Sequence, residues 1–419
     1  MSRTLIIVLS LFITFTGYSQ PQISLAELER SFLANNFELL VAKLNIDRAQ
    51  AETILAKRWH NPSFTLHQVN FWANGSSERL PNLIGNYGST QQVAVDLEQM
   101  IETANKRRKR IQLKSLERDQ VALEWQELLL AMKLELRSTY WDLIANEKEL
   151  EIQRDIVSNL KQFATEYKTL SDNGTVPKAE YLRIQTQYIS AITAATQLEN
   201  QNVALLGKLK LWTRMPDLSG KALIYEVITN HQLTQRIPVN VVEVAQQENI
   251  IALKAEKNSE IASSMMTLEK ANRNPDMRVL FSYDRGGSMM RDFIGFGVSV
   301  DLPLFNRNQE GIHKAQILQE QAELEKKYGQ AYVENQIQQL LKQLNHYEEV
   351  LLELKDETLD EFDDMLAIYQ DHLNSNQISV LEYMDLLTAY QSALQNKIEL
   401  EQNYMKIFEE LQYIVGKDF

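Results

Sequence analysis

Two acidic residues near the C-terminal end of the chain are spaced so that their carboxylates could attract cations together. Glu382 and Asp385 stand three residues apart at the start of a predicted helix, so both carboxylates lie on one helix face. Carboxylates gathered in this way favour cations. A local role is the alternative for Glu382, because Ser379-Val380-Leu381-Glu382 has the spacing of a capping box, which satisfies a helix N-terminus. Asp371 is a weaker candidate for the same acidic group.

The other residue types that carry chemistry lack the spacing that catalysis or metal binding requires. The chain has no Cys, which excludes disulfides, thiolate metal sites and cysteine nucleophiles. It also has no glycine-rich phosphate loop, no Gly-x-Ser-x-Gly elbow and no His-Glu-x-x-His. The adjacent Met pairs, Met265-Met266 and Met289-Met290, suit packing better than chelation. We expect no enzyme, no cofactor and no metal site, since the six His include no His-x-x-His or His-x-x-x-His pair: His60, His67, His231, His313, His346 and His372.

One basic run, Lys106-Arg107-Arg108-Lys109-Arg110, has the composition of a nucleic-acid motif. The net charge of −13 argues against a nucleic-acid partner. We expect this run to lie where a strand meets a helix, as a solvated or lipid-headgroup-facing patch. Trp59 and Trp72 bracket the first predicted strand, and either an interfacial aromatic girdle or plain packing accounts for them.

Residues 1–19 have the pattern of an export signal. Arg3 is the positive residue, Leu5 to Phe15 form the apolar stretch, and Gly17-Tyr18-Ser19 is a small-residue cleavage site. A membrane anchor is the alternative, but the apolar stretch is shorter than the roughly 20 residues of a spanning helix. Because no Cys follows, we expect no lipid-anchored N-terminus.

The chain is internally duplicated. Asn61-Pro62 returns as Asn274-Pro275, and Val93-Ala94-Val95-Asp96-Leu97 is echoed by Val298-Ser299-Val300-Asp301-Leu302. Ala179-Glu180-Tyr181-Leu182 is matched by Leu381-Glu382-Tyr383-Met384. The offsets are 213, 205 and 202 residues, so a half-protein of this length has been repeated rather than a solenoid unit. Glu180 is thus the counterpart of Glu382, whereas Arg183 replaces the second acid.

The helical pattern predicts two long rods and four shorter helices. No Gly or Pro interrupts Ile101 to Ser171, where Leu129, Leu136, Leu143, Leu150 and Val157 keep a seven-residue coiled-coil spacing. The second rod runs from Asn308 to Leu373. Shorter helices are expected at Ser24–Lys57, Lys178–Thr213, Asn240–Ala271 and Ser379–Ile414. In each half the two short lengths sum to nearly the long one, so two short helices should lie end to end beside one rod.

The domain boundaries follow from these elements. Residues 20–213 form the first repeat, residues 214–238 connect the halves, and residues 239–419 form the second repeat. Gly174-Thr175-Val176-Pro177 closes the first long hairpin, with Gly ending one helix and Pro opening the next. Asn376-Gln377-Ile378-Ser379 closes the second.

Four strands are predicted between the helices, two in each half. They are Val93 to Leu97, Met277 to Tyr283, Phe293 to Leu302 and a less regular strand after Pro62. The Arg285-Gly286-Gly287-Ser288 stretch is expected to be a hairpin loop. Four strands with one apolar face cannot close a spanning barrel, which needs about eight. We therefore predict a mainly α protein in which three copies share a 12-stranded outer-membrane barrel continued by a helical tunnel.

The signal, the duplicated halves, the Asn-Pro strand openings and the Gly-containing tip before Glu180-Tyr181-Leu182 resemble the TolC family of trimeric outer-membrane efflux ducts. The resemblance covers essentially all of the mature chain. Leu97 to Arg107 resembles the segment of the CzcC/CusC-like branch that usually ends Gly-Lys-Arg, with Asn105 where Gly is usual. That branch commonly serves heavy-metal efflux by resistance-nodulation-division (RND) pumps.

The resemblance implies an exit duct that works with a periplasmic adaptor protein and an inner-membrane RND pump. It implies that Glu382, Asp385 and Glu180 line a periplasmic constriction. The adaptor would contact the hairpin tips, and residues 214–238 would form an equatorial segment. The expected cargo is small solutes, including heavy-metal cations. A type I secretion duct for polypeptides and a soluble periplasmic coiled-coil scaffold are the alternatives.

Overall fold

The computed structural model describes residues 23–67, 82, 84, 92–220, 223, 233–286, 292–354, 365–366, 368–373, 375 and 377–419. The expected export signal (1–19), Trp72, His231, Met289-Met290, Gly287-Ser288, Asn376 and much of the connecting segment therefore lie outside the described residues. The elements follow in the order α1 (Leu25–Asn35), α2 (Phe37–Ala56), β1 (Ser63–His67), β2 (Val93–Ile101), α3 (Lys106–Asp172), α4 (Lys178–Thr213), η2 (Leu233–Arg236), α5 (Val241–Glu248), α6 (Ile250–Asn272), β3 (Met277–Arg285), β4 (Asp292–Val300), α7 (Gln309–Glu353) and α9 (Val380–Val415).

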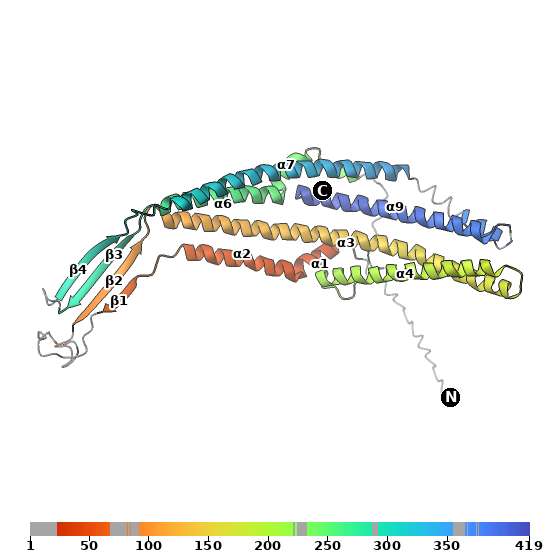
Figure 1. Cartoon of the computed structure of the whole chain (residues 1–419), viewed down its shortest axis with the longest axis horizontal. Coiled ribbons are helices and arrows are strands. Elements are labelled where there is room, and N and C mark those ends of the chain that lie inside the picture. The colour runs from red at the N-terminus through yellow and green to blue at the C-terminus, as the bar shows by residue number, and fades with distance from the viewer. Residues whose placement is uncertain are drawn as a thin grey trace, which may run out of the picture. The chain divides into compact units, whose positions relative to one another are not determined.

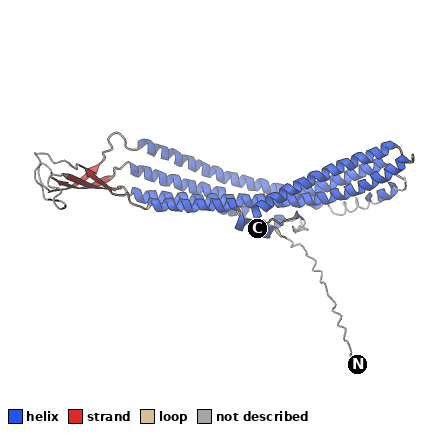
Figure 2. Ribbon diagram, turned by 90° about the horizontal axis from the view of Figure 1, so that it is seen from below, coloured by secondary structure: helices blue, strands red, loops and turns tan. Residues whose placement is uncertain are grey.

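The chain divides into two compact units. The sheet unit comprises Phe37–Leu134, Gln232–His346 and Ile407–Phe419. The hairpin unit comprises Met1–Asn36, Glu135–His231 and Tyr347–Lys406. In Figure 1 β2 leads into α3, β4 leads through a loop into α7, and α6 leads into β3. Figure 2 shows the strands gathered in one sheet.

A different short helix contacts α3 in each unit. In the sheet unit, Trp125 Nε1 donates a hydrogen bond to Leu39 O of α2 at 3.2 Å. In the hairpin unit, Gln153 Nε2 donates to Ala191 O of α4 at 3.0 Å. The prediction that two shorter helices flank successive stretches of one rod is therefore confirmed for α3. The heptad residues Leu136, Leu143 and Leu150 are buried, as their spacing predicts.

The second rod repeats this pairing. Ser259 Oγ of α6 donates to Glu323 Oε1 of α7 at 2.5 Å in the sheet unit. In the hairpin unit, Tyr404 Oη of α9 donates to Glu348 Oε2 of α7 at 2.6 Å. The rod was predicted to reach Leu373. Helix α7 is described to Glu353, and residues 368–373 are again helical.

Two of the predicted short helices are each broken in two, although the sequence pattern of each is continuous. Asn36, with φ −71° and ψ 116°, separates α1 from α2. Asn249, with φ −66° and ψ 126°, separates α5 from α6. Both are buried, and they are 213 residues apart, the same offset as the two Asn-Pro pairs. Asn249 Oδ1 accepts a hydrogen bond from Ala252 N at 2.9 Å and so caps α6.

The strands form one antiparallel sheet in the order β1-β2-β3-β4. β2 continues to Ile101, four residues beyond its predicted end, and α3 begins only at Lys106 instead of Ile101. Ala104 and Asn105 cause the difference, because their φ values of 50° and 58° are left-handed and incompatible with both strand and helix. β4 ends at Val300 rather than Leu302, and β1 is described only to His67.

The register gives the sheet one apolar face. Phe64, Leu97, Phe281 and Phe296 form a row across the four strands. The next row on this face is Leu66, Val95, Tyr283 and Ile294. The opposite face is mostly polar or small, as in the row Thr65, Asp96, Ser282 and Gly295. The apolar face is open to its surroundings, with Phe64 67% and Phe296 74% exposed.

Candidate functional site

The first hairpin turn has the geometry that its sequence predicts. Gly174 adopts φ +74°, and its neighbour Thr175 donates its N–H to Leu170 O at 2.9 Å, which closes the end of α3. Pro177 then sets the start of α4, where Glu180 N donates to Pro177 O at 3.0 Å. Gly174, Thr175 and Pro177 are exposed, whereas Val176 packs against the core below the turn.

The second turn has a comparable closure. Gln377 N donates to His372 O at 2.8 Å, and Ser375 N donates to Asp371 O at 3.0 Å. Ile378 packs against the same core as Val176. Asp371, Gln377 and Ser379 are exposed. Two turns from distant parts of the chain therefore rest on one apolar cluster.

This cluster joins α3, α4, α9 and the helical residues before the second turn. Phe163 of α3 and Tyr383 of α9 meet edge to face, with ring centroids 5.2 Å apart. Because Tyr383 lies between the acidic candidates, its burial fixes which way that part of α9 faces. The buried members of the cluster are Ile156, Leu160, Phe163, Ala164, Tyr167, Ile184, Ala191, Leu373, Val380, Tyr383, Met384 and Leu387.

Glu382 makes the capping box that was the alternative explanation for it. Ser379 N and Oγ donate to Glu382 Oε2 at 2.8 and 3.0 Å, and Glu382 N donates to Ser379 Oγ at 3.3 Å. The backbone N–H and then the hydroxyl of Ser379 hold the pKa of the Glu382 carboxyl below its ordinary value of 4.5. Asp385 is also exposed and makes no hydrogen bond or ion pair with another described residue. The carboxylates on this face of α9 are thus one anchored group and one free group.

The first-repeat counterpart differs in charge and setting. Glu180 is half-buried, and the exposed Arg183 occupies the place that matches Asp385. Burial raises the pKa of the nearby Tyr167 phenol, and the charges of Glu180 and Glu166 raise it further. Glu180 therefore faces the apolar cluster more closely than Glu382 does.

The basic run lies where β2 meets α3, as expected, but most of its side chains are not open as a solvated or lipid-headgroup-facing patch requires. Lys106 is buried, and its Nζ lies 2.8 Å from Asp276 Oδ1. Arg107 stacks on the Trp59 ring at 4.6 Å, and Arg110 pairs with Glu102. Burial alone would raise the pKa of Asp276, but hydrogen bonds from Lys106 and from Thr103 N lower it. Intrachain partners therefore hold three of the five cations, and only Arg108 is exposed.

Asn105 has a physical explanation in this junction. Its φ of 58° is a left-handed conformation, which Gly adopts freely and Asn tolerates better than most other residues. In the CzcC/CusC-like branch, which Leu97 to Arg107 resembles, Gly is usual at this place. Asn105 is therefore compatible with the same backbone geometry.

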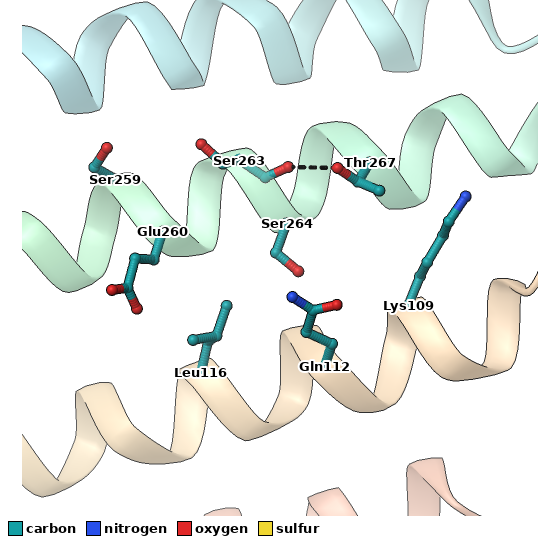
Figure 3. Close-up of a pocket in the computed structure, with 8 residues that line it drawn as sticks. All are labelled: Lys109, Gln112, Leu116, Ser259, Glu260, Ser263, Ser264 and Thr267. Atoms are coloured by element: carbon teal, nitrogen blue, oxygen red, sulfur yellow. Dashed lines mark hydrogen bonds between the residues drawn. The ribbon is translucent and has the colours of Figure 1, made fainter.

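A polar groove between α3 and α6 was not predicted. Its volume is about 370 Å³, and the side chains around it are mostly hydroxyl and amide groups (Figure 3). The helical spacing of Ser259, Ser263 and Thr267 on α6 is the sequence signal that could have indicated it. Such a lining can hold water or a polar solute. The lining residues are Lys109, Gln112, Leu116, Ser259, Glu260, Ser263, Ser264 and Thr267.

No helix in the described part of the chain is both long enough and apolar enough to cross a membrane. Among the same residues, no three or more His, Asp or Glu side chains gather as a metal site would require. A scan against models of protein families gives no match, and a search of curated proteins gives none.

Solved structures do match along most of the chain. CusC, a protein studied for transmembrane channel formation, is 14% identical, with 94% of this chain and 92% of that chain covered at a TM-score of 0.76. The CmeC outer-membrane channel of Campylobacter jejuni is 12% identical, with coverage of 94% and 85% and a TM-score of 0.75. The outer-membrane protein VceC of Vibrio cholerae is 12% identical, with coverage of 94% and 96% and a TM-score of 0.71. The chain therefore has the fold of these outer-membrane proteins, with long helical hairpins joined to a four-stranded sheet.

Proposed function

We propose that three copies of this chain form an outer-membrane channel, the passive exit duct of a tripartite efflux system. The observation that carries the proposal is the apolar sheet face, which one copy leaves open. Rows such as Phe64-Leu97-Phe281-Phe296 alternate with polar rows on the other side, as in a barrel with lipid outside and water inside. A passive duct performs no chemistry, and none of the expected site residues needs a cofactor.

The sheet edges support a shared barrel. Within the described strands, β1 and β4 are the edges of the sheet, and an unpaired edge is a template for another strand. β4 of one copy would pair with β1 of the next. Three copies would then close 12 strands around one axis, which a single sheet cannot do.

Two helices of the sheet unit carry exposed apolar stripes that suit the same assembly. Phe37, Val41 and Leu44 of α2 are spaced by four and three residues and are exposed. Ile317 and Leu324 of α7 are seven residues apart and also exposed. These are coiled-coil spacings, so α2 and α7 of neighbouring copies would bury each other's stripes.

Glu382 and Asp385 are proposed to line the periplasmic constriction, with Glu180 contributing from the first repeat. Around a three-fold axis, Glu382 and Asp385 would supply six carboxylates and favour cations. Both side chains are exposed, whereas Tyr383 on the other face of the same helix is buried in the apolar cluster. This arrangement supports the proposed role. Asp371 is a weaker member of the same set.

The hairpin tips are the proposed contact for a periplasmic adaptor. Gly174, Thr175 and Pro177 of the first tip and Gln377 and Ser379 of the second are exposed. Val176 and Ile378 hold the tips to the cluster below. The adaptor would connect the duct to an inner-membrane RND pump that supplies the cargo. Asn376, the remaining tip residue, is proposed by its place in the sequence.

The proposed cargo is small solutes. Among these we propose heavy-metal cations, because of the resemblance to the CzcC/CusC-like branch. The scattered His and Met residues agree with a duct that does not retain what it passes, since conduction requires weak binding. A type I secretion duct remains the alternative within the channel class. The efflux duct and the secretion duct differ mainly in the inner-membrane pump that supplies the cargo.

Conductance in planar bilayers tests the channel. Purified protein should give stable cation-selective steps, and E382A/D385A should give larger steps because the constriction is wider and less charged. E410A, which removes an exposed carboxylate elsewhere on α9, is the matched control and should leave the steps unchanged. Steps of equal size in E382A/D385A would remove these residues from the constriction. No steps from any preparation would favour the scaffold alternative.

A further inference from the structure

We infer that the loop between β4 and α7 is a membrane-interface ridge that seats in a phospholipid leaflet, with Leu302, Leu304 and Phe305 against the acyl chains. The inference rests on the proposed barrel. Phe305 is 100% exposed, and Leu302 and Leu304 are also exposed. Three large apolar side chains within four residues are costly in water, and a lipid surface removes that cost.

Three hydrogen bonds order the backbone of this loop. Leu304 N donates to Leu302 O at 2.8 Å across Pro303, and Arg307 Nε donates to Pro303 O at 3.2 Å. Asn308 Nδ2 donates to Glu269 O of α6 at 2.9 Å, which ties the end of the loop to the helix before β3. The backbone that carries the apolar side chains is therefore already ordered. Binding to lipid then costs little further conformational entropy.

The position of the loop indicates lipid as its partner. Val300, the last residue of β4, pairs with Met277 on the apolar face, so the ridge directly continues that face. In the antiparallel sheet, the start of β1 lies at the same end, where Trp59 is 59% exposed and stacked by Arg107. Aromatic side chains at the edge of an apolar band are typical of the membrane–water interface.

The charges at this end of the sheet fit phospholipid headgroups. Arg58, Arg108 and Arg307 are exposed, and none has a carboxylate partner among the described residues. The nearby acid Asp301 is paired with Arg278, with Arg278 Nη2 3.0 Å from Asp301 Oδ2. Uncompensated guanidinium groups next to an apolar ridge bind phosphate while the ridge enters the acyl region.

Because the chain has no Cys, single Cys variants can each carry one thiol-reactive bimane. F305C tests the ridge, F296C tests the apolar sheet face, and S299C tests the opposite face. Tyr328 on α7 is an exposed side chain away from the sheet, so Y328C gives the reference for an attached dye outside the sheet. Each variant is reconstituted into phosphatidylcholine–phosphatidylglycerol vesicles whose acyl chains carry bromine at a shallow or a deep position.

We expect strong quenching at 296 by deep bromine and at 305 by shallow bromine, with 299 and 328 close to the unquenched level. Quenching at 296 with 305 at the level of 328 would overturn the ridge and leave the channel intact, as when a second copy covers Phe305. No quenching at either 296 or 305 would overturn both the ridge and the proposed membrane barrel.

Discussion

Side chains at the start of α9 determine how the acidic pair behaves. Sequence spacing predicted both the pair and the capping box, but it could not decide between an ion-facing and a local role for Glu382. The structure shows the capping hydrogen bonds formed, while Asp385 has no such partner among the described residues. The decision depends on three-dimensional geometry, because a helix N-terminus and a pore can each engage a carboxylate.

The capping bonds predict a pH dependence for the channel. Since Ser379 holds the pKa of Glu382 below 4.5, its negative charge persists as the pH falls through the range where an ordinary Glu is protonated. Cation selectivity should therefore fall at a lower pH than an ordinary Glu would give. S379A removes the hydroxyl bond to Glu382 but keeps the backbone N–H bond, so it should move that fall part of the way to higher pH, as measured by reversal potentials in a salt gradient. E382Q removes the titrating carboxyl, so the wild-type pH profile in E382Q would show that Glu382 does not control selectivity.

A second residue prediction concerns the junction before α3. Ala104 has φ 50°, a conformation that costs an L-residue about 1–2 kcal/mol. A104G should stabilise the protein by about 0.5–1 kcal/mol, measured as a higher thermal midpoint by circular dichroism. A122G, in the interior of α3, should lower stability by about 1 kcal/mol. A lower midpoint for A104G would mean that Ala104 is not strained.

The helices and strands were predicted well where the pattern is long and regular. The bounds of α4 were predicted at both ends, because Pro177 precedes the first residue of the helix and Pro216 follows shortly after its last. The breaks at Asn36 and Asn249 were missed. Asn inside an amphipathic pattern is compatible with a helix, and only the buried contacts of its side chain make the break favourable. Likewise, the left-handed Ala104 gives no signal in sequence.

The break between α5 and α6 gives a prediction about these elements. Asn249 is buried, caps α6 through Ala252 N, and donates its side-chain N–H to Ile414 O near the end of α9. N249A should cost about 2 kcal/mol, since it removes a cap and leaves a buried carbonyl unsatisfied. N240A is the matched control, because Asn240 starts α5 without a side-chain capping bond. Equal thermal midpoints for the two variants would contradict this assignment.

At the scale of the whole molecule, the contacts between copies decide whether a trimer forms. The α2 stripe should be buried between copies, so L44E should place a charge in that contact and dissociate the trimer. The adjacent N45E adds the same charge at an exposed polar position and should leave the trimer intact. Native mass spectrometry in detergent distinguishes the two results. A trimer that survives L44E unchanged would show that this stripe lies outside the subunit contact.

The most direct test is the mass of the protein purified from envelope fractions, with and without detergent. One four-stranded sheet with an open apolar face and two open edges cannot be a finished structure in water. We expect a species of three chains that stays in solution only with detergent. A detergent-free monomer or dimer would mean that the sheet never enters a membrane, and the proposed duct would then be wrong.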